Sequence, residues 1–342
     1  MQAWLRAAGA HLVLVSICLW GIGRGAIAAA DSPADLEAAQ RAFAAEVAAA
    51  GGPPAQDVLA VLAGAKKQQS ILDAISRPAE ATRPWSAYAP IFLTDKRIAD
   101  GIAFYRTNRE LLERTGAKYG VPPELVVAIL GVETSYGANT GKYRVIDALS
   151  TLAFHYPPRA KFFAGELKRL FLLGDHQLAL PIDQLRGSYA GAMGWGQFMP
   201  TSVANWAVDA DADGRIDLWS SLPDIVESIA NYFVEHGWQA GQPVATRAQP
   251  AADARVLPDP GLDPVYPLQQ MEAWGYAPLE HVDADTPSTL LRLDGERGPE
   301  YWLVFGNFRA ITRYNKSPLY AMAVYQLSQS IAAGAARADA GR

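Results

Sequence analysis

One helix-forming stretch, residues 122–137, most constrains the fold of this chain. Eight apolar or small residues run without a break from Leu125 to Val132, and the carboxylate of Glu133 follows directly. Two prolines precede this run and suit the first turn of a helix, where a missing N–H group costs little. A helix that is apolar on every side belongs in the interior of a protein. The sequence therefore predicts a buried helix that carries an acid near its C-terminal end.

Glu133 in this position is expected to hold its proton more tightly than an ordinary carboxyl group. Burial disfavours its charged form, and the negative end of the helix acts in the same direction. Such a group can donate a proton near neutral pH. The alternative is a structural carboxylate paired with a nearby Lys or Arg, because structural ion pairs also perturb carboxyl groups. The helix considered alone favours that alternative.

Composition limits the size of the hydrophobic core and the kinds of molecule that the protein can bind. The chain has 342 residues and half of them are apolar, which is enough for one large domain or two modest ones. The formal net charge of -5 argues against nucleic-acid binding through bulk electrostatics. The patterns predict a mainly α-helical protein with a small β-containing subdomain.

The first 30 residues are typical of a secretory signal peptide. Basic residues precede an apolar run at residues 12–22, and residues 26–28 form an A-x-A cleavage pattern. An uncleaved signal anchor is the alternative, although the run is short for a membrane span. Cys18, the sole cysteine, follows Ile17, where bacterial lipoproteins carry a small residue, so lipidation is not expected. We expect a periplasmic protein that is soluble and has no disulfide.

Composition shifts and turn signals divide the chain into units. The expected units are a signal peptide at 1–30, an N-terminal helical domain at 31–120, a core at 121–238, a small β-containing subdomain at 239–309, a C-terminal helix completing the core at 310–335, and a tail at 336–342. Within the first domain, a helix is expected from about residue 95 to 115, with Gly116 as its C-terminal signal. Two helices are expected to divide at the proline pair 157–158. The runs TLLRLD and YWLVF predict a hairpin with the longer loop GERGPE.

Small residues crowd residues 187–196, and aromatic and amide side chains are interleaved with them or follow closely. Glycines at this density let the backbone approach a ligand closely. Tyr189 and Trp195 could supply flat surfaces for sugar rings, and Gln197 and Phe198 follow. The alternative is a tight loop between packed helices.

Residues 209–220, DADADGRIDLWS, resemble a calcium-binding loop. Positions one, three, five, six, seven and nine are held by Asp209, Asp211, Asp213, Gly214, Arg215 and Asp217. Ser220 stands at position twelve, where such loops carry a bidentate Glu, so calcium binding should be weakened. The sequence predicts either a structural calcium site or a capped acidic turn before the next helix.

An exported protein with one buried acid and a glycine-aromatic loop suggests an enzyme that cleaves glycans. Most glycosidases use two carboxylates, one as acid and one as base or nucleophile. Asp147, Glu166 and Asp175 are near in sequence, but none stands in a comparably apolar run. A mechanism with one carboxylate and a nucleophile supplied by the substrate fits better.

Six motifs run from Gly131 to Leu327. They are GVETSYG, GKYRVIDALSTLAFHYPPRAKFFAGEL, GSYAGAMGWGQFMPTS, ANYFVEHGW, FRAITRYN and YAMAVYQL. In order and spacing they resemble the membrane-bound lytic transglycosylase B family of bacterial peptidoglycan enzymes. The resemblance implies a lysozyme-like catalytic core that cleaves the β-1,4 bond between N-acetylmuramic acid and N-acetylglucosamine without hydrolysis. It implies peptidoglycan glycan strands as substrate, 1,6-anhydromuramyl ends as product and no cofactor required for catalysis. We expect the protein to be a monomer.

The resemblance also implies roles for individual residues. Glu133 would protonate the leaving oxygen and then accept the proton of the muramyl C6 hydroxyl as that oxygen attacks C1. The residues implied to contact or surround the glycan are Ser188, Met193, Gln197, Phe198, Tyr232, Asn315 and Tyr320. Packing is the alternative role for each of them. A hydrolytic muramidase and a non-catalytic peptidoglycan-binding or assembly protein remain the alternative functions.

Overall fold

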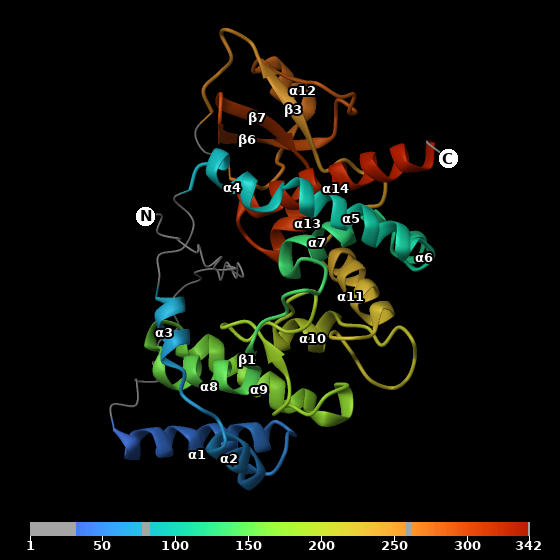
Figure 1. Cartoon of the computed structure of the whole chain (residues 1–342). Helices are drawn as coiled ribbons and strands as arrows, with labels where there is room; N and C mark the ends of the chain where they lie inside the picture. The colour runs from blue at the N-terminus through green and yellow to red at the C-terminus, as the bar shows by residue number, and fades with distance from the viewer. Residues whose placement is uncertain (1–31, 77–82, 258–260, 341–342) are drawn as a thin grey trace, which may run out of the picture.

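A computed structural model describes residues 32–76, 83–257 and 261–340, so the expected signal peptide at 1–30 and Cys18 lie outside the described residues. Figure 1 shows a β-sheet with α12 at one end of the molecule, α4–α7, α11, α13 and α14 in the middle, and α1–α3 with α8–α10 at the other end. The helices are α1 (Pro33–Ala49), α2 (Ala55–Ala63), α3 (Gln69–Ile75), α4 (Trp85–Phe92), α5 (Asp95–Thr107), α6 (Arg109–Tyr119), α7 (Pro123–Thr134), α8 (Val145–His155), α9 (Ala160–Gln177), α10 (Pro200–Trp206), α11 (Leu222–Glu235), α12 (Leu268–Ala273), α13 (Gly306–Tyr314) and α14 (Pro318–Ala340). The strands are β1 (Tyr143–Arg144), β2 (Arg186–Gly187), β3 (Ala245–Pro250), β4 (Tyr266–Pro267), β5 (Tyr276–Pro278), β6 (Pro287–Gly295) and β7 (Gly298–Val304).

Helix α7 lies at the centre of the main hydrophobic core, as its sequence predicts. Every residue from Leu125 to Val132 is buried, and α14, α5, α6 and α11 pack around the helix. Burying one aliphatic side chain stabilises the fold by roughly 1.5–3 kcal/mol. Burial of the apolar side chains of α7 therefore offsets the free-energy cost of placing an acid in its last turn.

The lower part of Figure 1 is a second layer of helices around α8 and α9. These two helices pack on each other and are divided by a 3-10 turn at Pro157–Arg159, which confirms the predicted break at the proline pair. Helix α3 packs on α8, while α1 and α10 pack on α9. The short ribbon β1–β2 joins this layer to the loop that carries Gln197.

The small subdomain is an antiparallel sheet in the order β4-β6-β7-β3-β5, covered by α12. The predicted hairpin is present as β6 and β7, but its expected six-residue loop is wrong. Gly295 pairs with Gly298, so the turn has only two residues between paired positions. Gly298 has φ +113°, a backbone conformation that glycine adopts without a steric cost. This freedom lets both strands continue into the stretch expected to be a loop.

The single helix expected from residue 95 to 115 is also wrong. The chain breaks at Asn108, whose side-chain amide donates a 2.9 Å hydrogen bond to the carbonyl of Phe104 and so competes with helix continuation. Helix α6 then passes through Gly116 and ends at Tyr119, where Gly120 caps it with φ +67°. A side chain at Gly116 would meet Pro123 at 2.9 Å, so this glycine serves close packing against α7. The domain boundaries expected from the sequence stay a prediction.

Candidate active site

Glu133 lies in the last turn of α7 with its side chain partly exposed. The hydroxyl of Tyr320, on α14, donates a 2.5 Å hydrogen bond to Glu133 Oε1. Burial raises the pKa of Glu133 to about 8, and the Tyr320 hydrogen bond offsets only part of that rise. Desolvation and this one hydrogen bond are the causes of the shift, and no described ion pair involves Glu133. The carboxyl group is therefore protonated at neutral pH, as the apolar helix predicts.

Two buried tyrosines, Tyr314 and Tyr320, lie near Glu133, and Tyr232 packs on Tyr314 with ring centroids 4.8 Å apart. Tyr320 is fully buried; Tyr314 donates a 2.6 Å hydrogen bond to the carbonyl of Gly196, and Tyr232 donates a 2.7 Å bond to the carbonyl of Arg313. Burial raises the pKa of Tyr314 and Tyr320 well above the ordinary value, and the nearby Glu133 adds to both rises. These hydroxyls therefore act as donors. Sequence reasoning missed Tyr314, although it directly precedes Asn315 in the RYN motif.

The backbone beyond Glu133 turns sharply because tertiary contacts hold it there. Ser135 and Tyr136 adopt φ values of 52° and 61°, a region that residues with side chains rarely occupy. The Tyr136 hydroxyl donates a 2.7 Å hydrogen bond to the carbonyl of Arg97, and an Arg97 nitrogen donates to Ser135 Oγ at 3.2 Å. A side chain at Gly131 would meet the Tyr136 hydroxyl at 2.6 Å. The glycine thus lets Tyr136 fold back against α7 and fixes the end of the helix that carries Glu133.

Gln197 presents a buried acceptor in the glycine-rich loop. Its backbone has φ 52°, and its side-chain nitrogen donates to the carbonyls of Thr140 at 3.2 Å and Gly194 at 2.9 Å. Its Oε1 atom is buried and has no hydrogen-bond partner among the described residues. A buried acceptor without a partner costs free energy unless a ligand donor satisfies it. Gln197 therefore offers an unused acceptor, and its contact with the glycan stays a prediction.

Other residues predicted to contact the glycan make hydrogen bonds or packing contacts within the protein. Ser188 Oγ accepts hydrogen bonds from the N–H groups of Ala190 and Ala192, and it is almost fully buried. Met193 is fully buried, and its backbone pairs with that of Phe198. The Asn315 side chain accepts from the N–H group of Ser317. Phe198 packs on Tyr232, with ring centroids 5.6 Å apart. Glycan contact by these residues stays a prediction.

The carboxylates that the sequence disfavours as a second catalytic group include two that accept hydrogen bonds from other parts of the fold. Asp147 accepts from Arg144 and from the segment before α3, and Glu166 accepts a 2.9 Å hydrogen bond from the N–H group of Thr201. Burial raises the pKa of Glu166. The side chain of Asp175 lies outside the described ones. Glu133 thus has no carboxylate partner among the described residues. This agrees with a mechanism that uses a single carboxylate.

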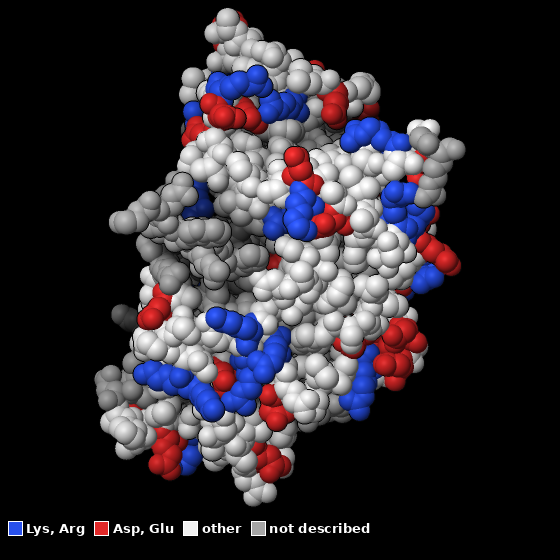
Figure 2. Space-filling model, viewed as in Figure 1, with Lys and Arg blue, Asp and Glu red and all other residues white. Residues whose placement is uncertain are grey.

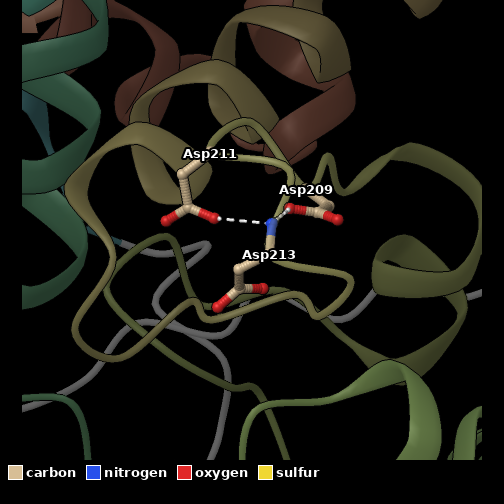
Figure 3. Close-up of side chains that lie close together, drawn as sticks. All are labelled: Asp209, Asp211 and Asp213. Carbon is tan, nitrogen blue, oxygen red and sulfur yellow. Dashed lines mark hydrogen bonds between the residues drawn. The ribbon is translucent and has the colours of Figure 1, made fainter.

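The acidic loop brings Asp209, Asp211 and Asp213 together, as Figure 3 shows. One carboxylate oxygen of each lies within 4.8 Å of the others. The N–H group of Asp213 donates to both Asp209 and Asp211, and Gly214 has φ +90° at the sharp turn. Carboxylate oxygens so placed suit a hard divalent cation such as Ca²⁺.

Two other residues of the predicted calcium set use their side chains in hydrogen bonds elsewhere. The Asp217 carboxylate accepts from Trp219, Ser220 and the Ser220 hydroxyl, and the Arg215 guanidinium donates to the carbonyl of Leu178. Sequence reasoning missed Asp224, a buried carboxylate four residues beyond the twelve-residue loop. It accepts 2.8 Å hydrogen bonds from the N–H groups of Ala210 and Asp217, so it ties the two ends of the loop together.

Comparisons with known proteins give a consistent result. Residues 35–329 match the family described as transglycosylase SLT domain. The chain is 41% identical over 286 residues to membrane-bound lytic murein transglycosylase B of Escherichia coli (strain K12), covering 81% of this chain and 78% of that protein. Its structure resembles that of the soluble lytic transglycosylase SltB1 from Pseudomonas aeruginosa, with a TM-score of 0.80 and 45% identity over 86% of this chain and 99% of that one. It also resembles the Escherichia coli lytic transglycosylase Slt35 in complex with calcium, with a TM-score of 0.78 and 39% identity over 87% of this chain and 93% of that one.

Proposed function

The chain belongs to the transglycosylase SLT domain family, and we propose that its lytic murein transglycosylase activity uses Glu133 as the single acid and base. The fold is the mainly helical, lysozyme-like one of this family, with a small β-sheet subdomain. The observation that carries the role of Glu133 is its protonated, partly exposed carboxyl group bound to Tyr320, without a described carboxylate partner. One acid at this end of a buried helix suits a reaction in which the glycan supplies the nucleophile.

The reaction needs two proton transfers at Glu133 and consumes no water. Glu133 donates its proton to the oxygen that links C1 of N-acetylmuramic acid to N-acetylglucosamine, and that C1–O bond breaks. The muramyl 2-acetamido group stabilises the cationic C1. The muramyl C6 oxygen then attacks C1, and its proton passes to the Glu133 carboxylate. The product carries a 1,6-anhydromuramyl end, and Glu133 recovers the proton with which it began.

The surroundings of Glu133 support this cycle. The desolvated setting favours the protonated acid before the first step. The Tyr320 hydrogen bond stabilises the carboxylate that forms after the first transfer, and it holds the carboxyl group in one orientation. The unpartnered Oε1 of Gln197 can accept a hydrogen bond from a sugar hydroxyl or acetamido N–H. Single-group catalysis of this kind contributes roughly 10²–10⁴-fold to the rate.

Product analysis on purified peptidoglycan tests the proposed reaction. We expect mass spectrometry to find 1,6-anhydromuramyl ends, which weigh one water less than reducing ends. Reducing muramic acid ends in their place would identify a hydrolytic muramidase. Failure of the pure protein to release any fragment would favour a binding or assembly role. The substrate is expected to be the glycan strand, and the protein is expected to act as a monomer.

We also propose that the loop at residues 209–217 holds a structural calcium ion, as the calcium complex of the Escherichia coli relative suggests for the family. Asp209, Asp211 and Asp213 would supply carboxylate oxygens, and calcium would offset their mutual repulsion. Ser220 at position twelve leaves the site without its bidentate Glu. The ion would stabilise the loop and would take no part in proton transfer at Glu133.

Calcium is expected to bind weakly, with a dissociation constant on the order of 10⁻⁴–10⁻³ M. At tenfold excess over that constant the folded state gains about 1.4 kcal/mol, which should raise Tm by about 2 °C. Calorimetric titration and thermal unfolding of the wild type and Asp211→Asn would measure both effects. Asp73→Asn, which changes an exposed carboxylate on α3, is the matched control. A wild type whose Tm and titration heat do not respond to 10 mM calcium would exclude a working site.

Export to the periplasm remains part of the proposal. The substrate of a murein transglycosylase lies outside the cytoplasm, and residues 1–30 have the pattern of a cleaved signal peptide. Among the described residues, no helix is both long and apolar enough to cross a membrane.

A further inference from the structure

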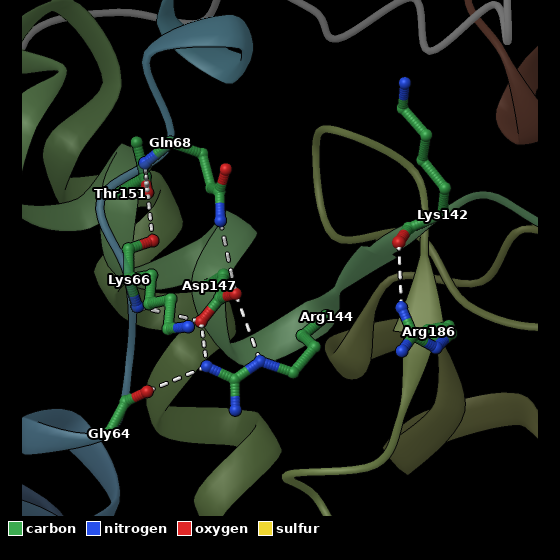
Figure 4. Close-up of polar contacts among 8 residues, drawn as sticks. All are labelled: Gly64, Lys66, Gln68, Lys142, Arg144, Asp147, Thr151 and Arg186. Atoms are coloured by element: carbon green, nitrogen blue, oxygen red, sulfur yellow. Dashed lines mark hydrogen bonds and ion pairs between the residues drawn. The ribbon is translucent and has the colours of Figure 1, made fainter.

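Cationic side chains gather on the lower half of the face shown in Figure 2, beside a recess between the two halves. We use the name basic patch for four cations: Lys66, Lys142, Arg144 and Arg186. Figure 4 shows them around the β1–β2 ribbon and the segment that precedes α3. Arg144 and Arg186 are direct cross-strand partners, and an Arg186 nitrogen donates a 3.0 Å hydrogen bond to the carbonyl of Lys142. Lys66, Lys142 and Arg186 are exposed.

The basic patch has a rigid base. Asp147 accepts hydrogen bonds from Arg144 at 2.6 and 3.1 Å and from the N–H group of Lys66 at 2.9 Å. Arg144 also donates a 2.7 Å bond to the carbonyl of Gly64. The network therefore ties the backbone at Lys66 to α8 and to strand β1. The Arg144 side chain and the backbone that presents Lys66 are therefore ordered before an anion binds.

The charge of the basic patch is largely uncompensated. Asp147 is buried and neutralises Arg144 alone. Lys66, Lys142 and Arg186 make no ion pair with a described residue. Arg186 faces Arg144 across the ribbon, and because Asp147 offsets only the charge of Arg144, the charge of Arg186 is available to an anionic ligand. The whole chain is acidic, with a formal net charge of -5, so this local excess of positive charge runs against the composition.

The same ribbon leads directly to the candidate active site. Lys142 is two residues from Thr140, whose carbonyl accepts the 3.2 Å hydrogen bond from Gln197. Arg186 is two residues before Ser188 in the glycine-rich loop. At about 3.3 Å per residue, the backbone of each cation lies within about 7 Å of a residue of the site. A ligand anchored near Gln197 can therefore reach the basic patch with a short substituent.

We propose that the basic patch binds the carboxylate groups of the stem peptide carried by the glycan strand in the active site. In a peptide-bearing strand the lactyl carboxyl group of muramic acid is held in the amide bond to the peptide, so the free carboxylates lie on the peptide. Lys and Arg side chains form charge-assisted hydrogen bonds with carboxylates, and Arg can do so through two nitrogens. The patch thus makes the enzyme prefer peptide-bearing strands over peptide-free strands. This inference rests on the proposed function.

Kinetics on two substrates test the proposal. Peptide-bearing glycan strands are compared with strands stripped of peptide by an amidase, which keep a lactyl carboxylate on the sugar but lack the peptide carboxylates. Both substrates are given to the wild type and to the double variant Lys142→Gln/Arg186→Gln. We expect the variant to lose about tenfold in kcat/KM on peptide-bearing strands, through a higher KM, because each exposed charge pair contributes up to about fivefold in affinity. Peptide-free strands should show no comparable loss. Raising the salt concentration to about 0.5 M should weaken the wild-type preference, since exposed charges are then screened.

Two further variants separate charge from structure. Arg186→Lys keeps the positive charge and is expected to retain most of the preference for peptide-bearing strands. Lys96→Gln/Arg292→Gln removes the same charge from exposed positions on α5 and β6 and should leave the preference intact. Equal loss on both substrates would overturn the proposal, as would a wild type that shows no preference. The release of anhydromuramyl ends from peptide-free strands tests the proposed function separately, so the two failures are distinguishable.

Discussion

Glu133→Gln is expected to lower the rate of glycan cleavage by on the order of 10³-fold or more. The amide has nearly the shape of the carboxyl group and can still accept the hydrogen bond from Tyr320, but it can neither donate an acidic proton nor take one back. Both steps of the proposed reaction therefore fail together. The measurement is the release of soluble fragments from purified peptidoglycan. Glu124→Gln, in the first turn of the same helix, is the matched control and should keep wild-type activity.

The free energy of unfolding shows whether the Glu133→Gln variant loses activity for chemical reasons or because its fold is damaged. The pKa of Glu133 rises from 4.5 to about 8 in the folded protein. Between these values the unfolded chain has lost this proton and the folded protein keeps it, so the free energy of unfolding of the wild type falls as pH rises. The amide introduced by Glu133→Gln does not titrate, so the variant should be more stable than the wild type by about 2 kcal/mol at pH 8, allowing for partial exposure. The two should be closely similar at pH 4.

Urea unfolding across this pH range distinguishes the outcomes. An active Glu133→Gln protein would remove Glu133 from the mechanism. An inactive variant that is less stable than the wild type at pH 8 would mean that the carboxyl group serves the fold. Activity of the wild type should also fall as pH rises past about 8, because the acid then loses the proton that it must donate.

Gly141→Ala is expected to lower the free energy of unfolding by about 3 kcal/mol or more. Gly141 has φ +96°, and an added methyl group would lie 2.0 Å from the carbonyl oxygen of Gly187 and 2.6 Å from the nitrogen of Ser188. These are backbone atoms of the facing strand, so no flexible side chain can move aside. The β1–β2 ribbon would have to open, and the Thr140–Gln197 hydrogen bond beside it would be disturbed. Activity should fall together with stability.

Two other glycines calibrate this effect. Gly237 has φ +88° but open space where a methyl group would go, so Gly237→Ala reports the cost of the backbone conformation alone, about 1–2 kcal/mol. Gly165 lies within α9 with open space around it, and Gly165→Ala should stabilise the protein by roughly 0.5–1 kcal/mol. A Gly141→Ala protein that unfolds at the same urea concentration as Gly237→Ala would contradict the close approach of the two strands.

Local patterns in the sequence were enough to identify the helix that carries the proposed catalytic acid. The unbroken apolar run before Glu133 predicts a buried helix with an acid of raised pKa, and both features are present. The proline pair at 157–158 predicts the break between α8 and α9, because proline itself restricts the local backbone. The family motifs are continuous stretches of sequence, so they can be recognised without knowledge of tertiary contacts.

Elements whose limits depend on packing were predicted less well. The break between α5 and α6 depends on one side-chain hydrogen bond of Asn108, and Gly116 is used for contact with Pro123 although it resembles a helix stop. The calcium loop has the expected Asp209, Asp211 and Asp213, yet its ends are joined by Asp224, which no loop pattern includes.

The sequence by itself determined the buried helix, the acid at its end and the family to which the chain belongs. Only the tertiary structure decided what surrounds that acid. Tyr320 lies 187 residues away from Glu133 in the chain, and Gln197 is oriented by the carbonyl of Thr140 across the β1–β2 ribbon. The basic patch likewise combines residues from three separate segments. Such arrangements arise because burial and hydrogen bonding act between neighbours in space, and a sequence pattern records only neighbours along the chain.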